Sequence, residues 1–284
     1  MDVKANNTIY FQALVEHSFI DLIMMFNQFF EIGSAFWAGV LLLSVRLGSV
    51  LLITPILGVF GLPARLKLLI VLTLSFALIY GAPDWTKSLA VDEVSVFLAF
   101  TSELMMGLTL SLGILMAFGA VSIAGRLLDT QVGFGMAQIF DPLTKRSHPI
   151  VTGGFNQFSV VLFFVLDFHH TLLRGIALSV DSFPIGKSWG FSESAPVLIK
   201  YFSGMFALGF SMVAPVVMSI LVVEFALAVL TRNLPQLHMF TLGVPIKILV
   251  GVFALVIWLA GAESVMRRIY SSIFDSWKVL FVHV

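Results

Sequence analysis

Residues 104–125 read LMMGLTLSLGILMAFGAVSIAG, and none of these 22 positions carries a charge. About 20 mostly apolar residues in an α-helix cross a bilayer core of about 30 Å. Other uncharged runs cover residues 47–64, 147–166 and 201–223. The runs are continuous, whereas a membrane β-barrel would show alternating stretches of about ten residues. They therefore predict an all-α membrane protein.

The composition of the 284-residue chain indicates the same class. Hydrophobic residues make up 59% of it and charged residues 11%, whereas a typical soluble domain has about 25% charged residues. A soluble protein cannot bury that much apolar surface, so a soluble enzyme is excluded and membrane lipid is the expected surrounding. The formal charge of zero argues against nucleic acid as a partner. The absence of cysteine excludes disulfides and thiolate metal sites.

About six hydrophobic helical segments are expected, several of them broken or bent into hairpins. They lie near residues 34–57, 66–82, 95–124, 147–178, 197–231 and 243–263. Pro215 falls inside the fifth segment, where a proline kinks or ends a helix, so a bend or a tight hairpin is expected there. Basic residues are divided almost evenly between the two sides, so the membrane orientation stays open.

Three parts are expected along the chain. In residues 1–33 apolar side chains recur at helical spacing between polar ones, which predicts an amphipathic N-terminal extension at an interface. A poorly ordered terminus fits the same residues equally well. Residues 34–275 form the membrane domain, and residues 276–284 are expected to be a C-terminal tail.

The segment at 95–124 carries a face of small residues. These are Gly107, Gly113, Ala117, Ala120 and Ala124. Small residues let helix backbones approach closely where lipid supplies no hydrophobic drive. We expect this face to pack tightly against another helix, either in this chain or in another subunit.

Three charges stand alone in apolar surroundings, namely Arg46, Glu103 and Glu224. A charge at membrane depth costs a few kcal/mol or more and normally faces protein or water. The three could belong to a proton or ion pathway, or form a structural pair. Two acids and one base do not make a relay, so a salt bridge between Arg46 and one glutamate is favoured.

The connection at residues 125–142 reads GRLLDTQVGFGMAQIFDP. Its glycines permit unusual backbone angles, and its apolar side chains include an adaptable methionine. Non-helical backbone at membrane depth survives only inside protein or beside a water-filled cavity. The connection could therefore be re-entrant and line or block a path, or be a short connector packed on a neighbour. Its candidate residues are Gly125, Asp129, Gln131, Gly133, Phe134, Gly135, Met136, Phe140, Asp141 and Pro142.

No catalytic or cofactor motif is present. The chain has no phosphate-binding glycine loop, no HExxH and no arguable Ser-His-Asp set, so neither an enzyme nor a cofactor is expected. Asp167, His169 and His170 could suggest a metal. Adjacent histidines on a helix point about 100° apart, however, so a polar helix end is expected there and no metal site.

Several motifs follow one another in a fixed order. They are Arg46 ahead of Pro55-Ile56-Leu57-Gly58, Leu62-Pro63-Ala64-Arg65-Leu66-Lys67, Glu103 to Gly107, Gly125 to Pro142, Asp167-Phe168-His169-His170, Ser182 to Gly186, Arg232 to Gln236, and Leu242 to Lys247. Over about residues 34–275 this series resembles the FliR family of flagellar type III export proteins. Phe168 and Ala228 stand where that family commonly has glycine.

The resemblance implies a core subunit of the flagellar type III export gate, in the bacterial inner membrane and the flagellar basal body. Its implied partners are FliP-like, FliQ-like and FlhB-like subunits, and exported unfolded flagellar proteins would pass through the gate. The connection at 125–142 would act as a plug loop that gates the pore. The equivalent injectisome subunit is an alternative. A proton-coupled secondary transporter using Glu103 or Glu224 is a further one.

Overall fold

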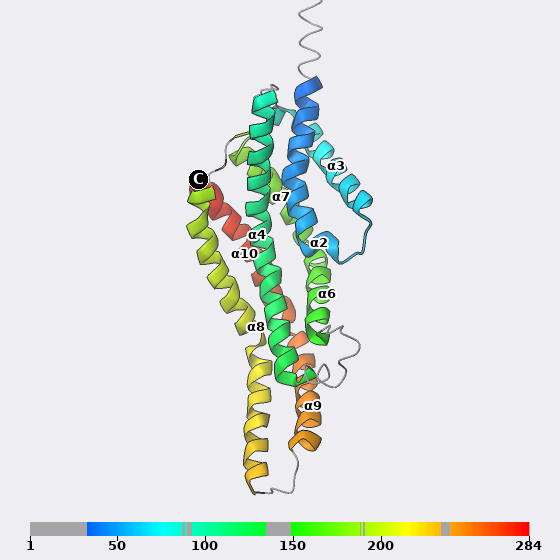
Figure 1. The fold of residues 1–284 in the computed structure, drawn as a ribbon, viewed down its shortest axis with the longest axis vertical. Coiled ribbons are helices and arrows are strands. Elements are labelled where there is room, and N and C mark those ends of the chain that lie inside the picture. The colour runs from blue at the N-terminus through cyan, green and yellow to red at the C-terminus, as the bar shows by residue number, and fades with distance from the viewer. Residues whose placement is uncertain are drawn as a thin grey trace, which may run out of the picture.

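The computed structural model describes residues 33–86, 89, 93–134, 149–187, 189, 191–233 and 239–283. These residues form an elongated bundle of helices without a strand among them (Figure 1). The predicted amphipathic extension at residues 1–33 lies outside them, apart from its last residue.

The first described elements are a helix at Gly33–Ile53 and the short helix α2 at Pro55–Gly58. The further helices of the described residues are α3 (Ala64–Gly81), the 3-10 turn η1 (Pro83–Thr86), α4 (Glu93–Val132), α6 (Ile150–Val165), α7 (Phe168–Ser182), α8 (Phe191–Asn233), α9 (Met239–Leu259) and α10 (Ala262–His283). Four helices, at Gly33–Ile53, Ala64–Gly81, Ser95–Val132 and Ser194–Asn233, are long and apolar enough to cross a membrane.

Two helix pairs are sharply bent. The pair α6 and α7 turns by 73°, and the segment at Gly243–Leu259 of α9 turns by 66° into α10. If each bent pair counts as one span, the described residues offer up to six spans. The prediction of an all-α membrane protein with about six segments, several of them broken, is confirmed.

A bend or a tight hairpin was expected in the segment at 197–231. The hairpin is wrong, because α8 is one helix of 43 residues with Pro196 and Pro215 inside it. Figure 1 shows that α8 changes direction near its middle, so the bend is present without a turn. A proline removes one backbone hydrogen bond. Membrane helices tolerate this loss where neighbouring groups satisfy the freed carbonyl.

The helix α10 was not expected from the sequence. Its apolar side chains recur at helical spacing and are fully or almost fully buried, namely Met266, Ile269, Tyr270, Ile273, Trp277 and Leu280. Charged side chains occupy its other face, including Glu263, Arg267 and Lys278. The stretch expected to be a tail, residues 276–284, is helical to His283.

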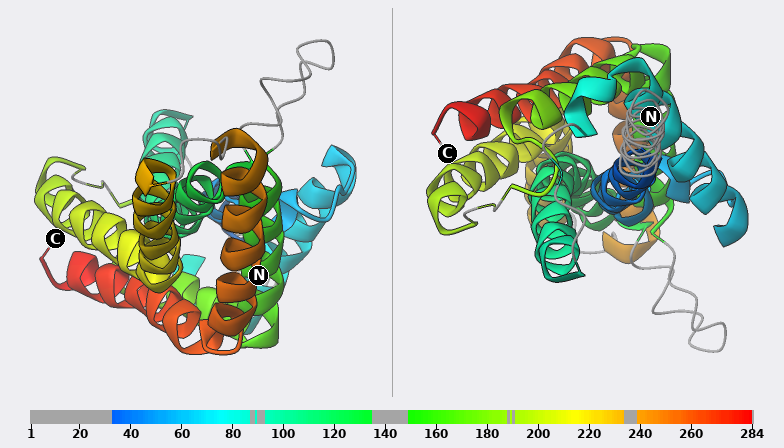
Figure 2. Two further views of the ribbon diagram at one scale, coloured as in Figure 1. Left: turned by 90° about the horizontal axis from the view of Figure 1, so that it is seen from below. Right: turned by 90° about the horizontal axis from the view of Figure 1, so that it is seen from above.

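The helix α4 lies between α8 on one side and α6 and α9 on the other (Figure 2) and also contacts α10. Its small residues meet different neighbours along its length. A Cβ atom at Gly107 would lie 2.8 Å from the carbonyl oxygen of Arg46, and one at Gly113 would lie 3.0 Å from Trp277 Nε1. Ala117, Ala120 and Ala124 are also buried. The close neighbours of this face are therefore helices of the same chain.

The Trp277 ring lies between two glycines of different helices. A Cβ atom at Gly175 of α7 would lie 2.7 Å from Trp277 Cζ3, and the indole nitrogen faces Gly113 of α4. The ring is 1% exposed. The end of α10 is thus inserted between α4 and α7.

A buried ion pair joins several helices of the bundle. Arg46 Nε lies 2.6 Å from Glu103 Oε2, and Arg46 Nη2 lies 2.9 Å from Glu103 Oε1. The guanidinium also donates to Ser179 Oγ at 3.1 Å and to the Phe183 carbonyl oxygen at 3.1 Å. Glu103 Oε1 accepts from the Gly186 amide at 3.0 Å. The pair therefore joins Gly33–Ile53, α4, α7 and the connection after α7.

Replacement of Gly113 by leucine should destabilise the fold by about 1–3 kcal/mol, because the added side chain must displace Trp277. Gly119→Leu is a matched control on the same helix, since a Cβ atom there meets nothing within 4 Å. The free energy of unfolding in mixed micelles measures both variants. Equal stability of the two would contradict the packing of Trp277 on Gly113.

Removal of one partner of the Arg46–Glu103 pair should cost about 3–5 kcal/mol, because the other charge stays buried without compensation. Arg46→Met and Glu103→Leu together should cost clearly less than the sum of the single changes. Unfolding of the wild type, the two single variants and the double variant in mixed micelles gives the coupling energy. The exposed pair Arg267–Glu263 serves as the control and should show a coupling of about 0.5 kcal/mol or less. Strict additivity at Arg46 and Glu103 would refute the coupling.

Candidate functional site

The candidate site is the junction where α4 ends and α6 begins. Asp129, a buried residue of α4, accepts from the amides of Val151 and Thr152, each at 2.9 Å. The Thr152 hydroxyl donates to the same carboxylate at 2.6 Å. The first amides of a helix have no partner within that helix, and Pro149 at the N-cap makes no side-chain bond to them. Asp129 therefore caps α6 from a neighbouring helix.

This cap depends on a close approach of the two helices. Gly125 lies one turn before Asp129 on the same face of α4. A Cβ atom at Gly125 would lie 2.8 Å from Thr152 Cα and 3.3 Å from its backbone nitrogen. Glycine at 125 thus admits the start of α6, and the carboxylate at 129 then binds the amides there. A negative charge at this end of a helix is also favoured by the helix dipole.

Part of the connection expected at residues 125–142 is helical in the structure. Gly125, Asp129 and Gln131 are helical, because α4 continues to Val132 rather than ending before 125. Gly133 has a φ of +96°, which favours glycine, and the partly buried Phe134 follows it. Gly135, Met136, Phe140, Asp141 and Pro142 lie outside the described residues.

An apolar cavity of about 360 Å³ lies beside this junction, between α4, α6 and α9. Val132, Phe134, Ile150, Phe155 and Gly251 are among its lining residues. Val132 is buried, and a Cβ atom at Gly251 would lie 2.8 Å from its Cγ2. The end of α4 is therefore fixed on both sides, by Asp129 on α6 and by Val132 on α9.

The three isolated charges of the sequence all have partners. Arg46 and Glu103 are bound to each other. Glu224 of α8 forms a salt bridge with Lys247 of α9, and both side chains are partly buried. Lys247 was not singled out from the sequence, because it is distant from Glu224 along the chain. The pairing of both glutamates favours structural roles for these charges over a proton pathway.

Loss of the carboxylate at 129 should loosen the first turn of α6. In Asp129→Ala the amides of Val151 and Thr152 should exchange hydrogen faster by about tenfold or more, because a buried charge-assisted hydrogen bond is worth about 1.5–3 kcal/mol. Hydrogen exchange with mass spectrometry on the detergent-solubilised chain measures this.

Thr130→Ala is the control for that experiment, since the Thr130 hydroxyl donates to the Arg126 carbonyl oxygen of its own helix and not to α6. Exchange at 151 and 152 should be unchanged in this variant. If Asp129→Ala also left exchange in this turn unchanged, the capping role of Asp129 would be refuted.

The comparisons with known proteins indicate the family of the chain. Residues 37–273 match the family described as bacterial export proteins, family 1. The chain is 31% identical over 262 residues to the flagellar biosynthetic protein FliR of Bacillus subtilis, which covers 91% of this chain and 98% of that protein. It is 28% identical over 239 residues to the FliR protein of Escherichia coli, covering 81% of this chain and 88% of that protein.

A relative with a different name is the Yop proteins translocation protein T of Yersinia pestis. It is 27% identical to this chain over 184 residues, which cover 63% of this chain and 70% of that protein. The matched region at 37–273 includes the Arg46–Glu103 pair, the Asp129 cap and most of α10. The chain therefore belongs to family 1 of the bacterial export proteins, the FliR family of flagellar type III export, and is a non-enzymatic protein with several membrane-spanning helices.

Proposed function

We propose that this chain is a core subunit of the flagellar type III export gate and forms part of its protein-conducting pore. It would act in the bacterial inner membrane, within the flagellar basal body, and unfolded flagellar proteins would pass through the assembled gate. The observation that carries the proposal is the family match over residues 37–273, together with FliR relatives aligned over nearly their whole length.

The lengths of two helices support assembly with other subunits. At the helical rise of 1.5 Å per residue, α4 with 40 residues and α8 with 43 residues are each about 60 Å long. This is about twice the thickness of the hydrocarbon core of a bilayer. A helix perpendicular to the membrane would therefore project well beyond the lipid.

The helix α8 is also poorly covered by its own chain. In the most apolar 18-residue stretch of Ser194–Asn233, only 17% of the residues are buried. Large apolar side chains remain exposed along it, including Phe202, Phe206, Phe210, Val222 and Phe225. Lipid can cover only part of a row this long, so protein must cover the rest. We assign that role to FliP-like and FliQ-like subunits, with an FlhB-like subunit associated.

The gating part of the proposal concerns the connection between Phe134 and Pro149. We propose that it is the plug loop, and that its apolar residues, Met136 and Phe140 among them, occlude the pore at rest. An apolar seal excludes water and ions, and methionine adapts to varied side chains of a passing chain. The Asp129 cap holds α4 and α6 together at the two ends of this connection. A plug that moves would thus have a fixed base.

The equivalent injectisome subunit is the second candidate, but the Yersinia relative covers less of the chain than the Bacillus FliR protein does. The proton-coupled transporter has less support. Glu103 is bound by Arg46 and by the Gly186 amide, and Glu224 is bound by Lys247.

Deletion of residues 135–141 should increase ion leakage through the assembled gate, because the apolar seal is removed. The deletion starts after Phe134, so Val132 and the Asp129 cap remain in place. Growth under sodium stress and membrane depolarisation, in cells that express all gate subunits, measure the leak. Seven alternating glycine and serine residues in place of 135–141 keep the length and remove the apolar surface, so this variant should leak as well.

The same cells provide the control for assembly. The tagged deletion variant and the wild type should both purify in mild detergent with FliP-like and FliQ-like chains, at masses that differ only by the deletion. A gate of normal mass without increased leakage would refute the plug. A wild-type chain that purifies without these partners would refute the export-gate assignment itself.

A further inference from the structure

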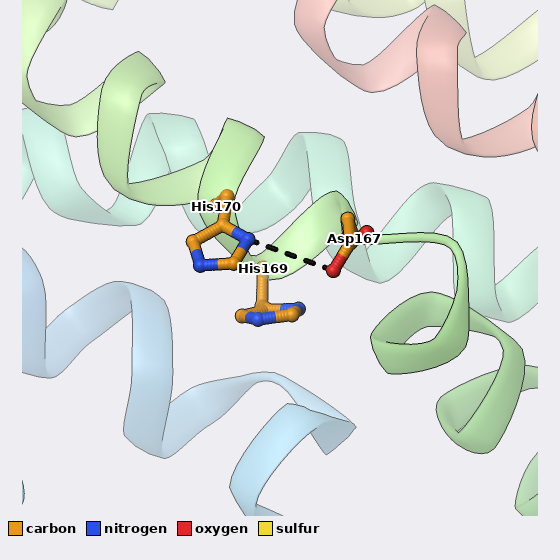
Figure 3. A group of neighbouring side chains, drawn as sticks. All are labelled: Asp167, His169 and His170. Carbon is orange, nitrogen blue, oxygen red and sulfur yellow. Dashed lines mark ion pairs between the residues drawn. The ribbon is translucent and has the colours of Figure 1, made fainter.

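A cluster of metal-binding side chain types lies at the bend between α6 and α7. It consists of Asp167, which joins the two helices, and His169 and His170 in the first turn of α7. Figure 3 shows the Asp167 carboxylate turned toward the His170 imidazole, with the His169 ring lying beneath the pair in that view. The cluster lies at a different helix junction from the Asp129 cap.

The donor atoms of the cluster lie close together. One donor atom from each of the three residues falls within 4.8 Å of the other two. Asp167 Oδ1 lies 3.6 Å from His170 Nδ1, and the two imidazole centroids are 4.1 Å apart. The sequence expectation of a polar helix end rested on the 100° between adjacent helical positions. That angle applies to the Cα–Cβ directions, and the side chain torsions here bring the two rings back together.

The backbone at Asp167 turns its carboxylate away from the usual role at this position. Asp167 is the N-cap residue of α7, where aspartate ordinarily accepts from the first amides of the helix. Asp167 makes no such bond. Its φ is +60°, and among the described residues other than glycine it alone has a positive φ. A left-handed aspartate is strained by comparison with glycine. The carboxylate lies beside His170 instead, with Oδ1 3.6 Å from Nδ1.

A second observation concerns the His169 ring. Its Nδ1 atom is buried and has no hydrogen-bond partner among the described residues. Buried polar atoms in native structures nearly always have a partner, and an ion is one of the partners that explain an exception. The ring is held by contact with Phe164, at 5.3 Å between centroids, so its position is fixed by α6.

We propose that Asp167, His169 and His170 bind a single divalent transition-metal ion of the zinc class. Imidazole and carboxylate together suit zinc, whereas magnesium and calcium prefer oxygen ligands alone. Zinc binds nitrogen and oxygen donors at about 2.0–2.2 Å. Donors around a tetrahedral ion are then about 3.3–3.5 Å apart. A movement of about 1 Å closes the cluster to that spacing, and the exposed side chains of Asp167 and His170 have room to make it.

The bound ion would brace the 73° bend. Asp167 belongs to the break between the helices, and both histidines belong to α7, so coordination fixes the first turn of α7 to the bend. The fourth position would be open to water, which is typical of a site with three protein ligands. The proposal does not depend on the export function, and a failure of either leaves the other standing.

The test is a titration of the full-length chain with zinc chloride by isothermal calorimetry. The chain is purified in detergent through an affinity tag without histidine and is treated with a chelator first. We expect one ion per chain. Asp167→Asn and His170→Gln should each weaken the affinity by about tenfold or more, since even residues that only support metal ligands contribute 10–100-fold.

Asp275→Asn is the matched control, because Asp275 is similarly exposed and also forms an ion pair three residues along its helix. Its affinity for zinc should equal that of the wild type. Circular dichroism verifies that the exposed substitutions keep the helices. The proposal is overturned if the wild type binds no zinc, or if folded Asp167→Asn and His170→Gln variants bind it as tightly as the wild type does.

Discussion

The buried pair of Arg46 and Glu103 is the interaction on which the arrangement of Gly33–Ile53, α4 and α7 depends. Both side chains are almost completely removed from solvent, which costs several kcal/mol per ion unless every polar atom finds a partner. The partners come from four places in the chain, including the Ser179 hydroxyl and the Gly186 amide. A shift of any one element would leave a charge unsatisfied, so the pair fixes their arrangement.

A buried acid and a glycine occur together twice on α4, once toward each end of the helix. Glu103 and Gly107 are four residues apart, as are Gly125 and Asp129. In each case a Cβ atom on the glycine would collide with the backbone of a neighbouring helix, and the acid binds that same helix. Glu103 does so through the Arg46 guanidinium, and Asp129 through the amides of Val151 and Thr152. The glycine permits the close approach, and the carboxylate makes that approach favourable. This explains why acids and glycines interrupt an otherwise apolar helix.

The long apolar helices could be predicted from the sequence, because the bilayer imposes their length and excludes charge from them. The helix α10 could not, since it is amphipathic and its uncharged runs are short. The helical end of α4 at Gly125–Val132 was mistaken for a loop for a similar reason. Its stability comes from Asp129 on α6 and Val132 on α9, and neither long-range contact leaves a local signal. The small face of α4 indicated a close neighbour, but only the structure identifies Trp277.

The bundle has buried polar contacts inside and exposed apolar side chains along α8, and this contrast bears on the proposed function. The bundle is held by buried polar contacts that tolerate little displacement, at Arg46 and Asp129, and by the partly buried salt bridge of Glu224 with Lys247. Away from these contacts α8 exposes a row of aromatic side chains, and the helix is longer than a bilayer is thick. In the proposed function, assembly with other subunits would therefore use the outside of the bundle. In the proposed function, movement during export would be confined to segments outside these contacts, because a shift of Arg46 or Asp129 would leave a buried polar group without its partner.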